Sequence, residues 1–307
     1  MIILQLGGGL GNQMFEYCFA KWLQNETNEK IIFDCNDIKK NEIEDREFSL
    51  INFNIAETHI GNKYLMGICE FIFKALYWGL RKVHNFNALS DDEYYMIMSH
   101  YGIYKCKKIY DGPKQFSKKR RIKFVSGNFQ NIFYVNQIPN IKKLFSIRCK
   151  LDASNEKLVK EIRNEESVCV HIRRGDYLSP LYSDLNVCSE EYYIKAMKYI
   201  ESKLENPVFY IFSNTHEDIE WIKSNMKFRD KWNIKYVDQN NKDYVELFLM
   251  KSCYSFIISN STFSWWAQYL SENENKIVVA PSIWNKEEIY KNESKKIYIS
   301  DWHLIDV

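Results

Sequence analysis

The stretch Ser167-Val-Cys-Val-His-Ile-Arg-Arg-Gly-Asp-Tyr177 decides the expected fold. Its run 168–172 is mostly apolar and β-branched, which is typical of a strand buried on both faces in a parallel sheet. The chain then changes abruptly to charged residues. Ligands of open α/β sheets bind in the crevice beyond the carboxyl ends of the strands, so we expect a binding site here. The polar residues expected at this crevice are His171, Arg173, Arg174 and Asp176.

The two adjacent arginines indicate an anion clamp. The planar guanidinium group suits the paired oxygens of a phosphate or carboxylate. A structural Arg–Asp network at the sheet edge is the alternative interpretation. We favour the clamp, because two arginines after an apolar run are costly unless something anionic satisfies them.

Length and composition exclude several classes of protein. A chain of 307 residues predicts two domains, and 46% hydrophobic residues indicate a folded globular protein. The net charge is only +2, so bulk charge does not suggest a nucleic-acid partner. The eight cysteines are scattered without a Cys-x-x-Cys pair, which favours small core residues in a reducing compartment.

The sequence favours a cytoplasmic protein with a possible peripheral contact to the inner membrane surface. The N-terminus lacks the pattern of a signal peptide, because glycines interrupt its apolar start. The most membrane-like segment, 64–80, contains Glu70 and Lys74 and is shorter than the ~20 residues of a spanning helix. A core or lid helix is the favoured interpretation, and a helix lying on a membrane is the alternative. For the basic run 118–123, a solvated loop is favoured over contact with anionic lipid or polysaccharide.

The first half of the chain opens with a strand, a glycine turn and a helix. Residues 2–6 form the predicted strand, 7–12 the turn, and apolar residues at helical spacing follow from Met14. This arrangement lets the backbone approach a ligand at a helix N-terminus. It is neither the dinucleotide fingerprint, since Asn12 stands where the third glycine would be, nor a P-loop. Residues 30–34 are the next predicted strand, and the pattern between 35 and 109 is weaker.

The second half alternates regularly between strands and helices, which predicts a parallel sheet covered on both faces. The predicted strands are 168–172, 208–212, 234–237, 256–259 and 276–280, and the predicted helices are 190–204, 217–226, 243–252 and 262–271. We expect the domain boundary in the charged stretch 150–164. The predicted domains are therefore 1–155 and 156–307, and the regular second half is the stronger candidate for binding a nucleotide.

Four strand ends in the second half finish in polar residues and should open on one edge of the sheet. They are Arg173-Arg174, Ser213-Asn214, Asp238-Gln239 and Ser259–Thr262. The last one starts a helix whose N–H groups and hydroxyls suit phosphate, an interpretation compatible with ordinary capping by Ser261 or Thr262. Of Trp265 and Trp266 we expect one ring in the core, and for the other a place in a sugar pocket is the less favoured interpretation.

The sequence also predicts that no metal takes part. No Asp-x-Asp pattern is present, and the six histidines show no paired ligand spacing. If a diphosphate leaves during the reaction, arginines must therefore stabilise it.

Several motifs resemble the α-1,2-fucosyltransferases of glycosyltransferase family eleven. They are Gly8-Gly-Leu-Gly-Asn-Gln-Met-Phe15, Gly127-Asn-Phe-Gln130, His171-Ile-Arg-Arg-Gly-Asp-Tyr177, Glu191-Tyr-Tyr193, Tyr210-Ile-Phe-Ser213 before Asp218-Ile-Glu-Trp221, Asn260-Ser-Thr-Phe-Ser-Trp-Trp266 and Ala280-Pro281 with Trp284. The resemblance covers nearly the whole chain except about 55–115. It implies an α/β fold of the GT-B type, with two facing Rossmann-like domains built on parallel sheets. It also implies GDP-fucose as a co-substrate, inversion at the anomeric carbon, and neither metal nor cofactor.

The same resemblance implies roles for individual residues. Arg173 would contact the β-phosphate and stabilise the departing GDP, and His171 and Arg174 would assist or brace it. Ser261, Thr262 and Phe263 would hold phosphate and fucose, while Asp238, Ser213 and Asn214 would lie near guanosine. Asn12 and Gln13 would face the acceptor or the fucose, with Gln130 and Trp265 on the acceptor side, and Asp176 is the first candidate to accept the acceptor's proton. Asn128, Glu16 and Cys18 depart from the residues usual in the family, which affects the acceptor and not the donor.

The expected activity is transfer of L-fucose from GDP-β-L-fucose to the 2-hydroxyl of a terminal galactose in an oligosaccharide or glycolipid, within cell-surface polysaccharide biosynthesis. Transfer with another linkage, or a non-catalytic nucleotide- or sugar-binding protein, are the alternatives. An oxidoreductase using a nicotinamide or flavin would explain the glycine turn, but the third glycine is missing.

Overall fold

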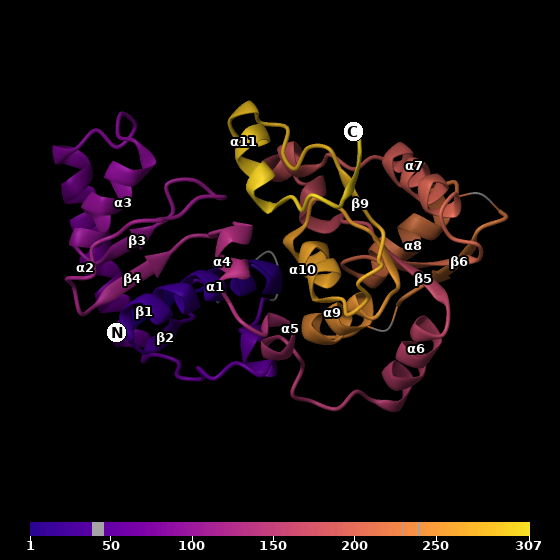
Figure 1. The fold of residues 1–307 in the computed structure, drawn as a ribbon, viewed down its shortest axis with the longest axis horizontal. Coiled ribbons are helices and arrows are strands. Elements are labelled where there is room, and N and C mark those ends of the chain that lie inside the picture. The colour runs from indigo at the N-terminus through magenta and orange to yellow at the C-terminus, as the bar shows by residue number, and fades with distance from the viewer. Residues whose placement is uncertain (39–45, 229, 239) are drawn as a thin grey trace. The chain divides into compact units, whose positions relative to one another are not determined.

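The chain forms two compact units, Met1–Leu144 and Phe145–Val307, each built on a parallel sheet (Figure 1). This computed structural model describes residues 1–38, 46–228, 230–238 and 240–307, without the side chains of residues 176, 178 and 181. The boundary falls earlier than the predicted 155/156. The reason is that helix α6 (Ala153–Arg163) packs on strand β5 (Glu166–His171) of the second unit.

The first unit holds a four-stranded sheet in the order β2-β1-β4-β3, with every neighbouring pair parallel. Its strands are β1 (Ile2–Gln5), β2 (Ile31–Asp34), β3 (Ile103–Lys105) and β4 (Lys123–Ser126). Its helices are α1 (Leu10–Thr27), the 3₁₀ turn η2 (Ser49–Asn52), α2 (Lys63–Val83), α3 (Asp91–His100), α4 (Ile132–Asn136) and α5 (Ile141–Leu144). The expected strand, turn and helix at the N-terminus are thus confirmed.

Aromatic side chains hold the helices of the first unit on its sheet. Phe19 of α1 stacks on Phe129, which follows β4, with ring centroids 3.7 Å apart. On α2, Phe73 stacks on Phe124 of β4 at 5.0 Å, and Met66 packs against Ile3 of β1. The inner face of helix α2 therefore packs on the sheet, as expected for a core helix.

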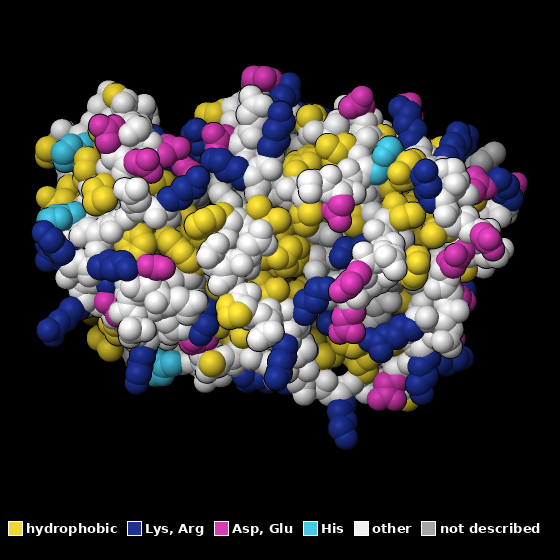
Figure 2. All heavy atoms as spheres, in the orientation of Figure 1, with side chains coloured by type: hydrophobic (Ala, Val, Ile, Leu, Met, Phe, Trp, Pro, Cys, Tyr) yellow, Lys and Arg dark blue, Asp and Glu magenta, His cyan; other side chains and the backbone are white. Residues whose placement is uncertain are grey.

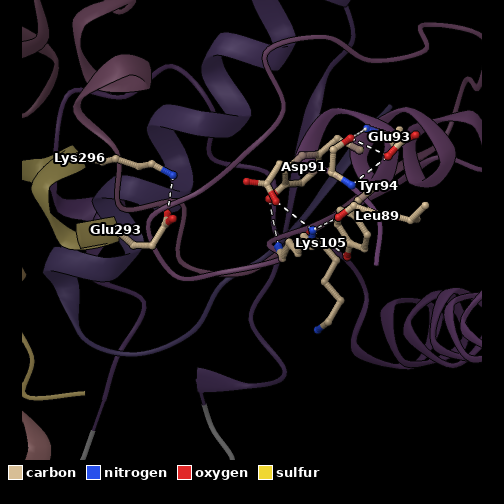
Figure 3. A network of polar contacts seen from close by, with 10 residues as sticks. Leu89, Asp91, Glu93, Tyr94, Lys105, Glu293 and Lys296 are labelled. Atoms are coloured by element: carbon tan, nitrogen blue, oxygen red, sulfur yellow. Dashed lines mark hydrogen bonds and ion pairs between the residues drawn. The ribbon is translucent and has the colours of Figure 1, made fainter. Parts of the chain in front are cut away.

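Helix α3 and strand β3 were not predicted, because their apolar pattern is short. A capping box starts α3: the Ser90 hydroxyl accepts from the Glu93 N–H, and the Glu93 carboxylate accepts from the Ser90 N–H at 2.9 Å. Lys107, beyond β3, donates to the Leu89 carbonyl oxygen and pairs with Asp91 at 3.0 Å. Figure 3 shows Asp91 and Glu93 in these contacts and also the Glu293–Lys296 ion pair of the second unit. These local contacts fix the end of the unit that the sequence pattern left undefined.

The second unit holds a six-stranded sheet in the order β10-β9-β8-β5-β6-β7, and every neighbouring pair is parallel. Its further strands are β6 (Pro207–Phe212), β7 (Asn233–Tyr236), β8 (Ser255–Ile257), β9 (Val278–Pro281) and β10 (His303–Ile305). Its further helices are α7 (Glu190–Glu201), α8 (His216–Asn225), α9 (Asp243–Lys251), α10 (Thr262–Leu270) and α11 (Glu288–Glu293), with the 3₁₀ turns η3 (Gly175–Leu178), η4 (Pro180–Leu185) and η5 (Ser294–Ile297). All five predicted strands and four predicted helices of this half are confirmed, whereas α11 and β10 were not predicted.

The strand order defines where a ligand can bind. From β5 the chain builds outward through β6 and β7, and it then returns to the other side of β5 with β8, β9 and β10. This is the doubly wound Rossmann order, whose reversal lies between β5 and β8. In such folds the crevice beyond the carboxyl ends at the reversal holds the ligand.

Candidate functional site

The candidate site lies where strands β5 and β8 end, at the reversal of the strand order. Val168 to Val170 of β5 pair with Ser255 to Ile257 of β8. Beyond this ladder, His171 Nδ1 lies 2.9 Å from Ser259 Oγ. A second tie follows, because the Tyr177 hydroxyl donates to the Asn260 carbonyl oxygen at 3.1 Å. The structure therefore brings together the two strand ends that carry the arginines and the serine-rich turn.

His171 is a neutral residue of this site. Its side chain is buried, and burial together with the charge of Arg173 lowers its pKa to about 3. The imidazole is consequently uncharged at neutral pH and held by Ser259 on one ring nitrogen. This geometry fits the bracing role expected of His171 and does not fit a proton donor.

Arg173 carries the positive charge of the site. It is half-buried, and its guanidinium carbon lies 5.3 Å from the centre of the Tyr177 ring. Its charge acts on the pKa of both His171 and Glu246. Arg173 therefore stands among groups that are close in space and come from β5, the η3 turn and α9.

Arg174 is held in a different way from its neighbour. Its guanidinium carbon lies 3.3 Å from the centre of the Trp221 ring, and its Nε lies 3.4 Å from Asp218 Oδ1. Burial raises the pKa of Asp218, an effect that the charge of Arg174 opposes. The structural Arg–Asp pair that the sequence left open is thus present for Arg174.

Asp218 and Trp221 were quoted in the sequence motif without a role. They stand three positions apart on α8, so a helix places them on one face, and that spacing was the available signal.

The end of β6 supplies an amide with an open acceptor. The Ser213 hydroxyl donates to the Ile172 carbonyl oxygen at 2.8 Å, so it ties β6 to β5. Asn214 Oδ1 is buried and has no hydrogen-bond partner among the residues that the structure describes. Its amide nitrogen would lie 3.2 Å from a Cβ on Gly175, whose φ is +40°. A buried acceptor of this kind is costly to leave unpaired and is suited to a ligand N–H or O–H group.

Helix α10 begins at this site. The Ser261 hydroxyl accepts from the Phe263 N–H at 3.3 Å, so the predicted capping role is confirmed. The Phe263 ring lies 6.0 Å from the His171 ring, centre to centre. Thr262 and Phe263 are half-buried. Their contact with phosphate and fucose stays a prediction.

Two residues expected on the acceptor side have no exposed surface, and that assignment is corrected. Trp265 is completely buried, its indole N–H donates to the Ile297 carbonyl oxygen at 2.6 Å, and its ring stacks on Tyr269. Gln13 is also completely buried, and its amide donates to the carbonyl oxygens of Gly8 and Glu47. Trp265 belongs to the core, and Gln13 braces the glycine turn instead of contacting sugar.

In the first unit, too, polar residues that follow two neighbouring strands meet where the strand order reverses, between β1 and β4. Gln130, after β4, donates to Asn12 Oδ1, after β1, at 3.1 Å. Gly8 has φ +66°, and a Cβ there would lie 2.5 Å from the Asn12 amide nitrogen. Asn12 and Gln130 are thus brought together, while their expected role toward the acceptor stays a prediction. The side chain of Asp176 lies outside the described residues.

One group of side chains in the described part of the chain has metal-ligand spacing. His216, Glu220 and Asp238 place their ligand atoms within 4.8 Å of one another, and all three are exposed. His216 Nδ1 lies 2.7 Å from Asp238 Oδ2, and Glu220 pairs with Lys223 at 2.6 Å. Asp238, expected near guanosine, is therefore engaged with His216. The absence of a metal from the reaction remains a prediction, because this trio offers the oxygen and imidazole ligands that a divalent cation accepts.

Glu246 of α9 is the residue of this site that the sequence did not predict. Burial, followed by the charge of Asp243, raises its pKa to about 8, against the opposing effect of Arg173. A carboxyl group that is protonated at neutral pH thus lies within range of the arginine charge. An acidic residue in the first turn of a helix is ordinarily explained by the helix dipole, which is why the pattern gave no signal.

Two Rossmann-like units in one chain, each with a parallel sheet and polar strand ends at its reversal, define the class of GT-B glycosyltransferases. The family model described as Glycosyl transferase family 11 matches residues 1–306, and the chain belongs to this family. The expected family and the α/β fold of GT-B type are confirmed.

The relatives carry more than one specificity. The chain is 31% identical to an alpha-1,2-colitosyltransferase of Escherichia coli, over 94% of this chain and 93% of that one. It is 28% identical to the O-antigen biosynthesis glycosyltransferase WbnK of Escherichia coli, over 97% and 98%. A galactoside 2-alpha-L-fucosyltransferase of Caenorhabditis elegans is 28% identical over 55% of this chain and 48% of that one. Among solved structures, NodZ alpha-1,6-fucosyltransferase soaked with GDP-fucose shares the fold, with a TM-score of 0.50 and 11% identity over 88% and 91%.

Replacement of Glu246 by glutamine tests its raised pKa. The folded state holds this proton up to about pH 8, whereas an unfolded glutamate loses it near 4.5. The stability that this carboxyl contributes is therefore present below pH 4.5 and is lost as the pH rises through 8. The melting temperature of Glu246→Gln minus that of the wild type, both measured by circular dichroism, should rise steadily over this pH range and level off above it. The exposed Glu288→Gln should show a flat difference, and a flat difference for Glu246→Gln would contradict the assignment.

Replacement of Trp265 by alanine tests its place in the core. Loss of a fully buried indole should lower the free energy of unfolding by about 3–5 kcal/mol, measured by urea titration. Trp78→Ala, which removes an indole that is 56% exposed, serves as the control and should change stability far less. A small change in the free energy of unfolding for Trp265→Ala would contradict its place in the core and favour the surface of a pocket.

Proposed function

We propose that this protein is an inverting, metal-independent α-1,2-fucosyltransferase. It transfers L-fucose from GDP-β-L-fucose to the 2-hydroxyl of a terminal galactose in an oligosaccharide or glycolipid. The observation that supports this proposal best is the place of Arg173 at the β5/β8 reversal, two residues beyond the contact of His171 with Ser259. The similarity to a galactoside 2-alpha-L-fucosyltransferase adds support.

The proposed chemistry depends on charge at the leaving diphosphate. As the bond between the anomeric carbon and the β-phosphate oxygen breaks, its electron pair stays on that oxygen. Arg173 would stabilise this charge with charge-assisted hydrogen bonds, while the positive end of the α10 helix dipole favours the same anion. The galactose 2-hydroxyl attacks the opposite face of the sugar, which converts the β-linkage of the donor into an α-linkage. Its proton then passes to a carboxylate or to water.

The surroundings of Arg173 suit this task. His171 is neutral, and Glu246 is protonated at neutral pH, so neither neutralises the guanidinium group in advance. Because Glu246 already holds its proton at neutral pH, Asp176 stays the candidate to receive the acceptor's proton. Asn214 Oδ1 would accept from an N–H group of the guanine base.

A colitosyl donor is the second candidate. The observation that favours it is the 31% identity to an alpha-1,2-colitosyltransferase over nearly the full length of both chains. Colitose is L-fucose without its 3-hydroxyl, so the two sugars differ by one polar group. A site built to bind that hydroxyl would discriminate strongly between them, because its buried polar groups would stay unpaired with colitose. Comparison of kcat/KM for GDP-fucose and for the matching colitosyl nucleotide, with the product linkage determined by NMR, decides between them.

Substitution of Arg173 tests the proposed role of its charge. Arg173→Ala should lower kcat with a β-galactoside acceptor and saturating GDP-fucose by about 10²-fold or more, as expected on losing one charge-stabilising donor. Arg173→Lys should restore only part of the rate, since lysine lacks the planar fork. Arg163→Ala, on the exposed face of α6, is the matched control and should keep the normal rate. A near-normal kcat for Arg173→Ala in a protein of unchanged melting temperature would refute the proposal.

Removal of divalent cations tests the second part of the proposal. Transfer should continue at an undiminished rate in excess EDTA, because a guanidinium group replaces the cation at the diphosphate. Loss of transfer in EDTA, reproduced by His216→Ala, would instead assign a catalytic metal to the trio His216, Glu220 and Asp238.

A further inference from the structure

Helix α2 carries a continuous apolar stripe on its outer face. The stripe runs from one end of the 21-residue helix to the other, at the spacing of one helix face. Tyr64, Phe71 and Trp78 are exposed to 81%, 73% and 56%. The large exposed residues of this stripe are Tyr64, Leu65, Ile68, Phe71, Ile72, Trp78 and Val83.

The fold of the first unit does not explain this stripe. The inner face of α2 already packs on the sheet, through Met66, Phe73 and Leu80. A helix that covers a sheet ordinarily turns a polar face to water. Contiguous apolar surface on a folded protein marks an interaction site. A cavity of about 510 Å³ lies along the first half of the stripe, lined in part by Tyr64, Ile68 and Phe71.

The exposed charges of α2 itself are of one sign. The exposed charged residues of α2 are Lys63, Lys74, Arg81 and Lys82. Its single acidic residue, Glu70, is buried and paired with Lys74. At the far end of the helix, the Arg81 guanidinium lies 5.2 Å from the centre of the Trp78 ring. An aromatic ring beside a cation, at the rim of an apolar stripe, is the pattern of a helix at the interface between lipid and water.

A second basic segment lies at the same edge of the sheet. Leu80, near the end of α2, packs with Ile103, the first residue of β3. The exposed run 118–121 leads directly into β4, which is the neighbour of β3 and parallel to it. Both basic segments therefore flank the starts of these two strands. Figure 2 shows Lys and Arg side chains among hydrophobic ones at the left end of the molecule, where Figure 1 places α2.

We propose that the outer face of α2, with the basic run 118–121, docks on the surface of an anionic phospholipid bilayer. The apolar stripe enters the boundary between headgroups and acyl chains, and the surrounding cations bind the lipid phosphates. Within the described residues no helix is long and apolar enough to cross a membrane, so α2 lies in the plane of the surface. This inference does not depend on which sugar the protein transfers.

Co-sedimentation of the full chain with vesicles tests the proposal. The wild type should bind vesicles of equal parts phosphatidylglycerol and phosphatidylcholine, and bind pure phosphatidylcholine at least about tenfold less, since the cations contribute by attracting anionic lipid. Raising the salt concentration should release it, because salt screens these charges. Both measurements use the unmodified protein, so they do not depend on the folding of a variant.

Matched variants locate the binding face. Phe71→Glu with Ile72→Glu, and separately Arg81→Glu with Lys82→Glu, should each lower binding about tenfold or more at an unchanged melting temperature. Ile289→Glu, on the exposed face of α11, and Lys157→Glu with Lys195→Glu, on α6 and α7, are the controls and should bind normally. Equal binding by wild type and α2 variants would overturn the proposal. The proposal would also be overturned if the wild type did not bind vesicles but formed a dimer, and if Phe71→Glu with Ile72→Glu made that dimer dissociate. The face would then be covered by a second copy of the chain.

Discussion

The parallel pairing of β5 with β8 is the constraint on which the second unit depends. These strands are far apart in the sequence, and their pairing reverses the strand order of the sheet. Because the pairing is in register up to Val170 and Ile257, the next residues of both strands emerge together, and His171 meets Ser259 at 2.9 Å. A shift of one residue would turn His171 to the opposite face of the sheet. The place of Arg173 just beyond the β5/β8 ladder therefore follows from backbone register before any side chain is considered.

The two adjacent arginines then acquire different tasks from their surroundings. Arg174 is fixed by Trp221 and Asp218 of α8, so much of its binding capacity is used inside the protein. Arg173 lies near His171, which is neutral, and near Glu246, whose pKa of about 8 keeps it protonated at neutral pH. Burial thus keeps His171 and Glu246 from placing a charge against Arg173 at neutral pH. The attraction of a guanidinium group for an anionic ligand is strengthened by the low dielectric of a buried site.

Much of this architecture could be predicted from the sequence, and the failures have physical causes. Runs of β-branched residues between helical patterns predicted the second sheet, since burial on both faces leaves a strong signal. The outward or inward direction of Trp265 left no such signal, because an indole on a helix is equally compatible with a core and with a pocket. The pKa of Glu246 depends on its burial where α9 packs against α10 and α6, which no local pattern encodes. Helix α3 was missed because a capping box, and not a long apolar period, defines it.

The geometry also bears on whether a cation or an arginine meets the diphosphate. A divalent cation is best held by ligands that are preorganised and whose charge is not already compensated. In the trio His216, Glu220 and Asp238 the ligand groups are exposed, and all three are already engaged: His216 contacts Asp238, and Glu220 pairs with Lys223. Arg173, in contrast, follows directly on a buried strand and is held near the reversal by the ties from His171 to Ser259 and from Tyr177 to Asn260. Preorganisation decides how much a charge stabilises a transition state, because a fixed group needs no rearrangement when the bond breaks. By that criterion the arginine, and not the exposed trio, is the better built electrostatic partner of a leaving diphosphate.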